Sequence, residues 1–124
     1  DDQLLRRLCA SDADLPQVCV HGTYLRHVQS ILQQGLLAGG GVSSRKHVHF
    51  APFEPGDGRV ISGMRSSCEV AVYVDVRRAL GDGVPFFLST NQVILSPGLQ
   101  GVVPSAYIKG MKHLQTGHWV HGGP

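Results

Sequence analysis

The pattern of apolar and polar positions along the chain predicts short β-strands and one main helix. In residues 17–23, "QVCVHGT", apolar and polar side chains alternate, which predicts a strand that ends near Gly22. Residues 24–36 then carry apolar side chains every three or four positions, the spacing of a helix that buries one face. Thr23 is the expected N-cap of this helix and Gly35 its expected C-cap. The N-terminus of the helix should therefore lie at the end of the strand.

Short apolar runs between turn residues predict further strands. Residues 69–76, "EVAVYVDV", are an almost continuous β-branched and aromatic run, which predicts a strand buried on both faces at the centre of the sheet. We expect other strands at 46–52, 84–90 and 91–98, a turn or short helix at 77–83, mostly loop at 53–68 with a helical turn near 60–64, and an edge strand or irregular tail at 102–109. The expected fold class is α+β, a β-rich single domain over residues 1–124 with one main helix after the first strand.

Composition adds only broad limits to this picture. Eleven Lys and Arg against nine Asp and Glu give a net charge of +2, too small alone to predict nucleic-acid binding. Any recognition of phosphate must therefore be local. The three cysteines form no Cys-x-x-Cys pair, so neither a zinc ribbon nor a disulfide framework is supported. No apolar run has the roughly 18 residues of a membrane span, and the charged start is unlike a signal peptide, so we expect a soluble intracellular protein, cytoplasmic or nuclear.

Polar residues gather at the end of the first predicted strand. His21, Gly22 and Thr23 place an imidazole, a backbone open to close approach and a hydroxyl at the N-terminus of the predicted helix. The partial positive charge of a helix N-terminus attracts phosphate and ribose oxygens, so this segment is a candidate binding site for them. The alternative is that His21 is a hydrogen-bonded core histidine and Thr23 only a helix cap.

A second polar group stands in residues 45–50, "RKHVHF". His47 and His49 should lie on one side of the predicted strand, because strand side chains alternate. No third ligand stands at close spacing, so we expect no metal site. Arg45 can donate two N–H groups to a phosphate, or it is a solvated loop cation. Arg65, surrounded by small residues, is a less certain candidate, in a segment without the Lys and Thr of a triphosphate-binding loop.

No protein nucleophile or general base stands out. The chain has no Gly-x-Ser-x-Gly motif, and Cys68 has no adjacent histidine. Glu69 and Asp75 flank a predicted strand and Asp82 falls in a predicted turn, where carboxylates usually have structural roles. The candidate chemistry is therefore binding of a polyanionic ligand and stabilisation of charge during a transfer.

Taken in order, five segments between about residues 15 and 108 resemble the RNA 2′-phosphotransferase family of the KptA type. They are "HGTYLRHVQSILQQGL", "SRKHVHFAP", "GDGRVISGMR", "CEVAVYVDVRRALGDGVPFFLSTNQVILSPG" and "VVPSAYI". Their order and spacing make the resemblance specific, and residues 1–14 and 109–124 carry no family motif. The resemblance implies an ADP-ribosyltransferase-type fold and removal of an internal RNA 2′-phosphate, such as that at a tRNA splice junction, with NAD⁺ as acceptor.

The resemblance also implies a mechanism and a set of site residues. The 2′-phosphate attacks C1 of the nicotinamide ribose and expels nicotinamide; the neighbouring ribose 2-hydroxyl then attacks the phosphorus, releasing repaired RNA and ADP-ribose 1″,2″-cyclic phosphate. The substrate phosphate is thus the nucleophile. The positions that match the NAD-binding motifs are His21, Gly22, Thr23, Gly35 and Arg65. Of these, His21 and Thr23 would contact the ribose and pyrophosphate, and Gly35 would line the adenosine pocket.

The remaining implied roles concern RNA. Arg45 matches the family arginine that grips the transferred phosphate, and His47 and His49 would line the substrate cleft. The family's N-terminal winged-helix-like lobe, with its Arg-His pair and "RANQGHS"-like segment, matches nothing in this chain. We therefore expect this chain to be the C-terminal NAD-binding lobe, completed by a lobe in cis or in trans. The alternatives are a stand-alone module that binds NAD or ADP-ribose, and an ADP-ribosyltransferase that acts on nucleic-acid phosphate ends.

Overall fold

The fold consists of short antiparallel strands with one main helix. The computed structural model describes residues 4–41, 47–59 and 67–123. The strands are β1 (Leu5–Arg7), β2 (Val20–Thr23), β3 (Leu36–Leu37), β4 (Val48–Phe50), β5 (Val70–Val74), β6 (Phe87–Ser89), β7 (Ile94–Ser96), β8 (Val102–Val103), β9 (Ile108–His113) and β10 (Trp119–Gly122). The helices are α1 (Val28–Gln34) and α2 (Val76–Gly81), with 3₁₀ turns η1 (Leu25–His27), η2 (Ala38–Gly41) and η3 (Ser105–Tyr107). The structure is thus mixed and β-rich, as expected.

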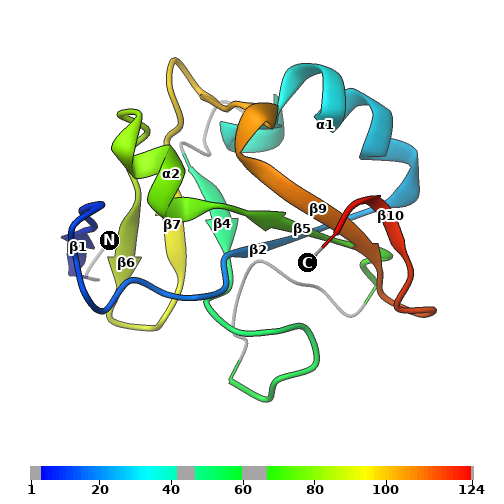
Figure 1. The fold of residues 1–124 in the computed structure, drawn as a ribbon, viewed down its shortest axis with the longest axis horizontal. Coiled ribbons are helices and arrows are strands. Elements are labelled where there is room, and N and C mark those ends of the chain that lie inside the picture. The colour runs from blue at the N-terminus through cyan, green and yellow to red at the C-terminus, as the bar shows by residue number, and fades with distance from the viewer. Residues whose placement is uncertain (1–3, 42–46, 60–66, 124) are drawn as a thin grey trace.

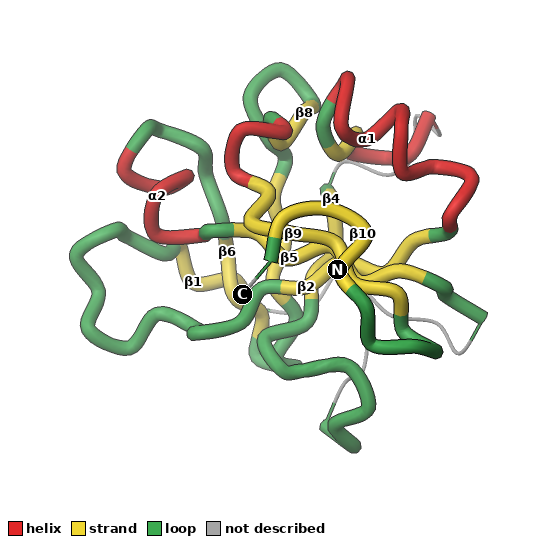
Figure 2. The backbone as a smooth tube through the Cα atoms, turned by 45° about the vertical axis from the view of Figure 1, so that its right-hand side comes forward, coloured by secondary structure: helices red, strands yellow, loops and turns green. Residues whose placement is uncertain are grey.

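Two four-stranded sheets form the body of the molecule. One has the order β1-β6-β7-β4 and the other the order β10-β9-β5-β2, and β3 pairs with β8 in a small third sheet. The two large sheets meet where Val20 and Ala51 form an isolated bridge between β2 and β4. Figure 1 shows β1 and β10 at opposite ends of the molecule. The red segments in Figure 2, α1, α2 and the 3₁₀ turns, lie mostly on one side of the strands.

Apolar side chains from both sheets and from α1 form one core. Val70, Ala71 and Val72 of β5 are fully buried, as are Phe50, Phe86 and Ile94 from the other sheet. β5 lies between β9 and β2, so the predicted strand at 69–76 is confirmed, with its central position and two-sided burial. Burial of large apolar side chains is the main favourable term in folding, and it explains why this run is the clearest strand in the sequence.

The start of the helix differs from the prediction. Thr23 does not cap it, because Thr23 remains in β2 and is 6% exposed. Tyr24 precedes η1 and His27 precedes α1, and neither makes a side-chain capping hydrogen bond. The backbone N–H of Leu25 instead donates to Oε1 of Glu69 at 2.9 Å. A carboxylate from the neighbouring strand end thus satisfies an N–H that the predicted cap was expected to satisfy.

The end of the helix is as predicted. Gly35 is the C-cap of α1, with a φ of 83°, and its N–H donates to the Ile31 carbonyl at 2.7 Å. This left-handed backbone conformation favours glycine. The strands predicted at 84–90 and 91–98 are confirmed as the shorter β6 and β7, and the short helix at 77–83 is confirmed as α2. The helical turn predicted near 60–64 lies outside the described residues.

The C-terminal part of the fold was predicted least well. The edge strand predicted at 102–109 is confirmed only in part: β8 is one strand of the two-stranded β3-β8 sheet, but η3 follows it and β9 begins at Ile108, inside its sheet between β5 and β10. β1 and β10 were not predicted, so the main helix follows the second strand rather than the first. None of the helices in the described ranges is long and apolar enough to cross a membrane.

Candidate functional site

The two large sheets separate immediately after their bridge. Val20 and Ala51 exchange two backbone hydrogen bonds, of 3.0 and 2.8 Å. The C=O of Cys19 accepts a hydrogen bond from the Val74 N–H of β5 at 2.9 Å, so alternate residues of β2 face β5 and β4. By this alternation, the N–H and C=O of Gly22 face the side on which β4 departs. Within the described residues, β4 pairs with β2 only at the Val20–Ala51 bridge. Gly22 therefore presents an adjacent donor and acceptor there.

The imidazole of His21 spans the gap between the separating strands. Its Nδ1 lies 2.8 Å from the backbone oxygen of His49 in β4, and its ring meets the Phe50 ring edge-on at a centroid distance of 5.9 Å. A carbonyl oxygen only accepts, so Nδ1 carries the hydrogen. In the neutral ring, Nε2 is then an acceptor with no hydrogen of its own.

The charge state of His21 follows from its surroundings. Burial lowers the pKa of His21 below the ordinary value for histidine; the hydrogen bond to the His49 carbonyl acts in the opposite direction, and the nearby His49 side chain lowers it further. His21 is therefore neutral near pH 7, with a tautomer fixed by its partner. The ring can accept a hydrogen bond from a hydroxyl group and carries no charge with which to hold a phosphate.

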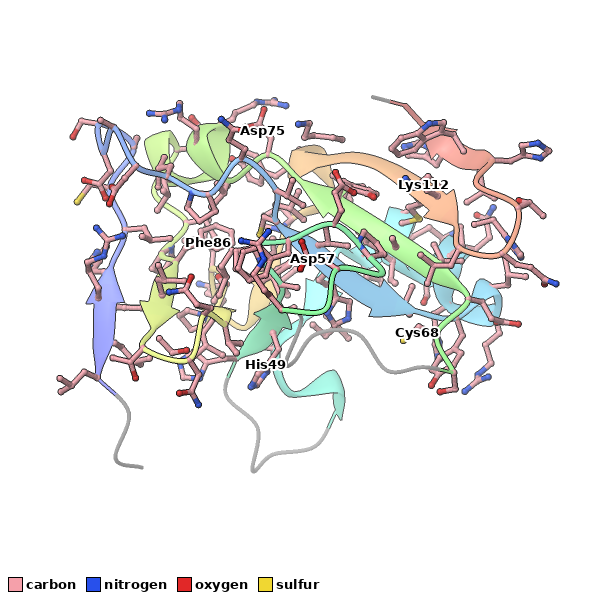
Figure 3. All side chains as sticks on the ribbon, turned by 90° about the horizontal axis from the view of Figure 1, so that it is seen from below. His49, Asp57, Cys68, Asp75, Phe86 and Lys112 are labelled. Carbon is pink, nitrogen blue, oxygen red and sulfur yellow. The ribbon has the colours of Figure 1, made fainter. Side chains whose placement is uncertain are left out.

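The second predicted polar group is only partly described. His47 lies in a bend before β4 begins at Val48, and His47 and His49 are both half-buried whereas Val48 and Phe50 are buried. His49 lies in β4 (Figure 3), and its backbone carbonyl is the group that joins this strand to His21. Arg45 and Arg65 lie outside the described residues. The predicted phosphate grip therefore stays a prediction from the sequence.

Gly35 has a structural reason to be glycine. A Cβ atom at this position would overlap the carbonyl oxygen of Val103 and would lie 2.9 Å from Cγ1 of Val102. The close approach lets the chain pass from α1 directly into the pairing of β3 with β8. The nearest neighbours of Gly35 are thus in β8, at the opposite end of α1 from β2. The structure brings His21, Gly22 and the His49 carbonyl together, and it places Gly35 against β8.

The carboxylates next to β5 have structural roles, as the sequence suggested. Glu69 accepts the Leu25 N–H described above, and Asp75 caps α2 by accepting the Arg78 N–H at 3.1 Å. In the parts of the chain that the structure describes, no three His, Cys, Asp or Glu side chains are grouped so that they could hold a metal ion. The partner of His21 was missed by the sequence reasoning, because a backbone carbonyl 28 residues away leaves no signal in the sequence.

Most of the chain, including the strands of this site, is similar to a known protein family. A family model described as "RNA 2′-phosphotransferase, Tpt1/KptA family" matches residues 1–98, which include β2 and β4. The chain belongs to the RNA 2′-phosphotransferase family. This membership confirms the resemblance drawn from the ordered motifs, and the match begins at residue 1 and ends at residue 98 instead of running from about 15 to 108.

Relatives within this family support the assignment. The protein named tRNA 2′-phosphotransferase 1 of Danio rerio is 45% identical over 115 residues, covering 92% of this chain and 49% of the relative. Its namesake in Homo sapiens is 55% identical over 84 residues, covering 68% and 32%. The tRNA 2′-phosphotransferase of Saccharomyces cerevisiae is 36% identical over 110 residues, covering 84% and 46%. The chain thus spans about half of these relatives or less.

Proposed function

We propose that this chain is the NAD-binding lobe of an RNA 2′-phosphotransferase, a single domain with an ADP-ribosyltransferase-like fold. The enzyme would transfer an internal RNA 2′-phosphate to NAD⁺, giving ADP-ribose 1″,2″-cyclic phosphate and nicotinamide. The observation that carries the proposal is the family match over residues 1–98, within which β2 and β4 separate at His21 and Gly22. Family relatives are named for action on tRNA, so an RNA with an internal 2′-phosphate is the proposed substrate.

The residues at the separation of β2 and β4 fit the polar groups of NAD⁺. A carboxamide carries a donor and an acceptor side by side, which complements the adjacent N–H and C=O of Gly22. A ribose hydroxyl can donate to Nε2 of His21, whose Nδ1 is engaged by the His49 carbonyl. When bound, NAD⁺ supplies an electrophilic ribose carbon and a cationic leaving group. These residues would hold and orient it, and Thr23 and Gly35 are proposed contacts by their motif positions alone.

The phosphate of the RNA would be held by arginine. Arg45 stands at the position of the family arginine that grips the transferred phosphate, and a guanidinium matches two phosphate oxygens with parallel N–H groups. The roles of Arg45 and Arg65, and of His47 and His49 as residues of the substrate cleft, rest on the sequence. The neutral His21 is suited to ribose rather than to phosphate, which separates the two tasks between different residues.

A turnover assay tests the proposal. An RNA oligonucleotide with one internal 2′-phosphate is incubated with NAD⁺ and the chain, alone and with the N-terminal half of a full-length relative added. We expect loss of the 2′-phosphate and formation of ADP-ribose 1″,2″-cyclic phosphate, at least in the mixture. Arg45→Ala should abolish product, whereas Arg59→Ala should not, because the exposed Arg59 is paired with Asp57. No product in either sample, or unchanged product with Arg45→Ala, would contradict the proposal.

A binding module is the second candidate, because the neutral His21 and the backbone of Gly22 can hold a ligand but supply no nucleophile. Such a module would bind NAD⁺ or ADP-ribose without turning over RNA. Calorimetry should then show heat of ADP-ribose binding that His21→Ala reduces, with no product even in the mixture.

Labelled NAD⁺ with terminally phosphorylated RNA or DNA separates both candidates from an ADP-ribosyltransferase that acts on phosphate ends, since only that activity would label the nucleic acid.

A further inference from the structure

An aromatic and cationic group lies on the β10-β9-β5-β2 sheet, outside the site described above. Tyr73 of β5 and Trp119 of β10 lie with ring centroids 5.4 Å apart and ring planes at 52°. The Nζ atom of Lys112 in β9 lies 5.4 Å from the centroid of each ring. We call these three residues the hairpin platform, because Lys112 and Trp119 belong to the β9–β10 hairpin. Figure 3 labels Lys112 in this hairpin.

The pairing of the strands builds the hairpin platform. Trp119 pairs with Lys112, and Gly110 pairs with Tyr73, so all three side chains share one face of the sheet. A Cβ atom at Gly110 would lie 2.9 Å from Cζ3 of Trp119. The missing side chain at Gly110 therefore leaves room for the indole to lie over β9 and against Tyr73. Each platform residue is partly buried and keeps part of its surface exposed.

The β9–β10 hairpin carries basic side chains and no acidic one. All nine acidic residues of the chain stand at or before Asp82, so residues 83–124 carry none. The same stretch contains Lys109 and Lys112, and its three histidines all stand in or beside the β9–β10 hairpin. Among the described residues, the carboxylate in contact with the platform is that of Glu54, and it accepts the hydrogen bond of the Tyr73 hydroxyl at 2.7 Å. The hairpin is thus a local positive region in a chain of low net charge.

We propose that the hairpin platform binds single-stranded RNA. A base would stack on the rings of Trp119 and Tyr73, and the ammonium group of Lys112 would meet an adjacent phosphate. Stacked aromatic rings beside cations are the usual means of binding unpaired nucleotides, because every base has a flat face and every linkage a negative charge. The proposal rests on the proposed function, since it gives the RNA substrate a second point of attachment. Lys112 and Trp119 lie beyond residues 1–98, which the family model matches, whereas Tyr73 lies within them.

The chain carries its own probe for this contact, because Trp119 is its single tryptophan. The chain is titrated at low salt with an unmodified single-stranded RNA octamer while the tryptophan emission is measured. A fluorescein-labelled octamer gives the affinity by anisotropy. We expect saturable quenching at the same RNA concentration at which the anisotropy rises. A duplex of the same length should quench less, because its bases are already stacked.

Substitutions separate stacking from charge. Trp119→Ala should weaken binding about five- to a hundred-fold, and Trp119→Phe much less, because phenylalanine keeps a stacking face. Lys112→Ala should weaken binding and reduce the slope of log affinity against log salt by about one. Arg6→Ala removes a cation from β1, at the other end of the molecule, and should change neither quantity (Figure 1). Far-ultraviolet circular dichroism and the urea midpoint establish that each variant is folded.

The outcomes distinguish this proposal from the proposed function. Unchanged tryptophan emission at saturating RNA would overturn the platform. So would RNA affinities equal to that of the parent chain in all three folded variants, Lys112→Ala, Trp119→Phe and Trp119→Ala. Quenching by an acidic peptide but not by RNA would also overturn it, in favour of a protein partner. NAD⁺ binding, measured by calorimetry, should be the same in all platform variants. If NAD⁺ binding fails in the parent chain while RNA still quenches Trp119, the proposed function fails and the platform stands.

Discussion

Replacing His21 by asparagine should reduce the pH dependence of the free energy of unfolding. Burial holds the pKa of His21 below its ordinary value in the folded chain, whereas an unfolded histidine titrates near pH 6.5. Between these two values the unfolded chain binds more protons than the folded chain. The stabilising contribution of neutral His21 is therefore complete above about pH 6.5 and is lost as the pH falls towards the pKa of the folded state. Asparagine does not titrate, so the variant lacks this contribution.

The size of the effect has two parts. One proton bound more tightly by the unfolded chain changes the free energy of unfolding by at most about 1.4 kcal/mol per pH unit. His21 should therefore account for up to about that much between pH 6.5 and 5.5. At pH 7.5 the variant also loses the hydrogen bond to the His49 carbonyl and the contact with the Phe50 ring. Those losses together should lower the free energy of unfolding by about 1–3 kcal/mol.

Urea unfolding at pH 7.5, 6.5 and 5.5 measures both parts. The parent chain should lose more stability across this range than His21→Asn does, and the difference between the two chains belongs to His21. His118→Asn is the matched control, because it replaces an exposed histidine by the same residue. If His21→Asn and the parent chain lose the same free energy between pH 7.5 and 5.5, the description of His21 as a buried neutral acceptor is wrong.

Three further predictions concern the frame around the site. Gly35→Ala should lower the free energy of unfolding by at least about 2 kcal/mol, because alanine disfavours a φ of 83° and its Cβ overlaps β8; an unchanged urea midpoint would contradict this. Asp75→Ala should cost about 1 kcal/mol through loss of the α2 cap, against about 0.5 kcal/mol or less for Asp14→Ala in an exposed ion pair; equal losses would speak against the cap. The Cys19 thiol, whose pKa is raised by burial, should react with a disulfide reagent only after unfolding, whereas exposed Cys9 reacts in the native chain; mass spectrometry of the labelled peptides decides.

The parts of the fold that were predicted correctly carry their signal in a single segment. Residues 70–74 are apolar or aromatic throughout and mostly β-branched, so β5 is evident from the sequence. Gly35 follows a periodic apolar stripe, so the end of α1 is also evident. By contrast, β9 is interrupted by Lys109, Gly110 and Lys112, and its place inside the sheet depends on pairing with β5 and β10. Tertiary pairing outweighed local preference there.

The candidate site, like the fold, was predicted correctly only where a single segment carries the signal. His21 was identified because a histidine at the end of an apolar strand is unusual and begins a family motif. Its neutrality and tautomer depend on burial and on the His49 carbonyl, which only the fold brings close. The failed cap at Thr23 has the same cause, because Thr23 extends β2 against β5 instead of starting the helix. The N–H and C=O of Gly22 are likewise left without a strand partner because the sheets separate there, and no local sequence pattern predicts that separation.

The central claim is that NAD⁺ binds where β2 separates from β4. Its most direct test is a ¹⁵N–¹H correlation spectrum of the chain during titration with NAD⁺. The account predicts a saturable shift of the Gly22 amide, together with a change in the ¹⁵N resonances of the His21 ring, and a weaker apparent affinity for His21→Asn. Saturating shifts elsewhere with Gly22 and His21 unchanged, or no shifts at millimolar NAD⁺, would contradict it.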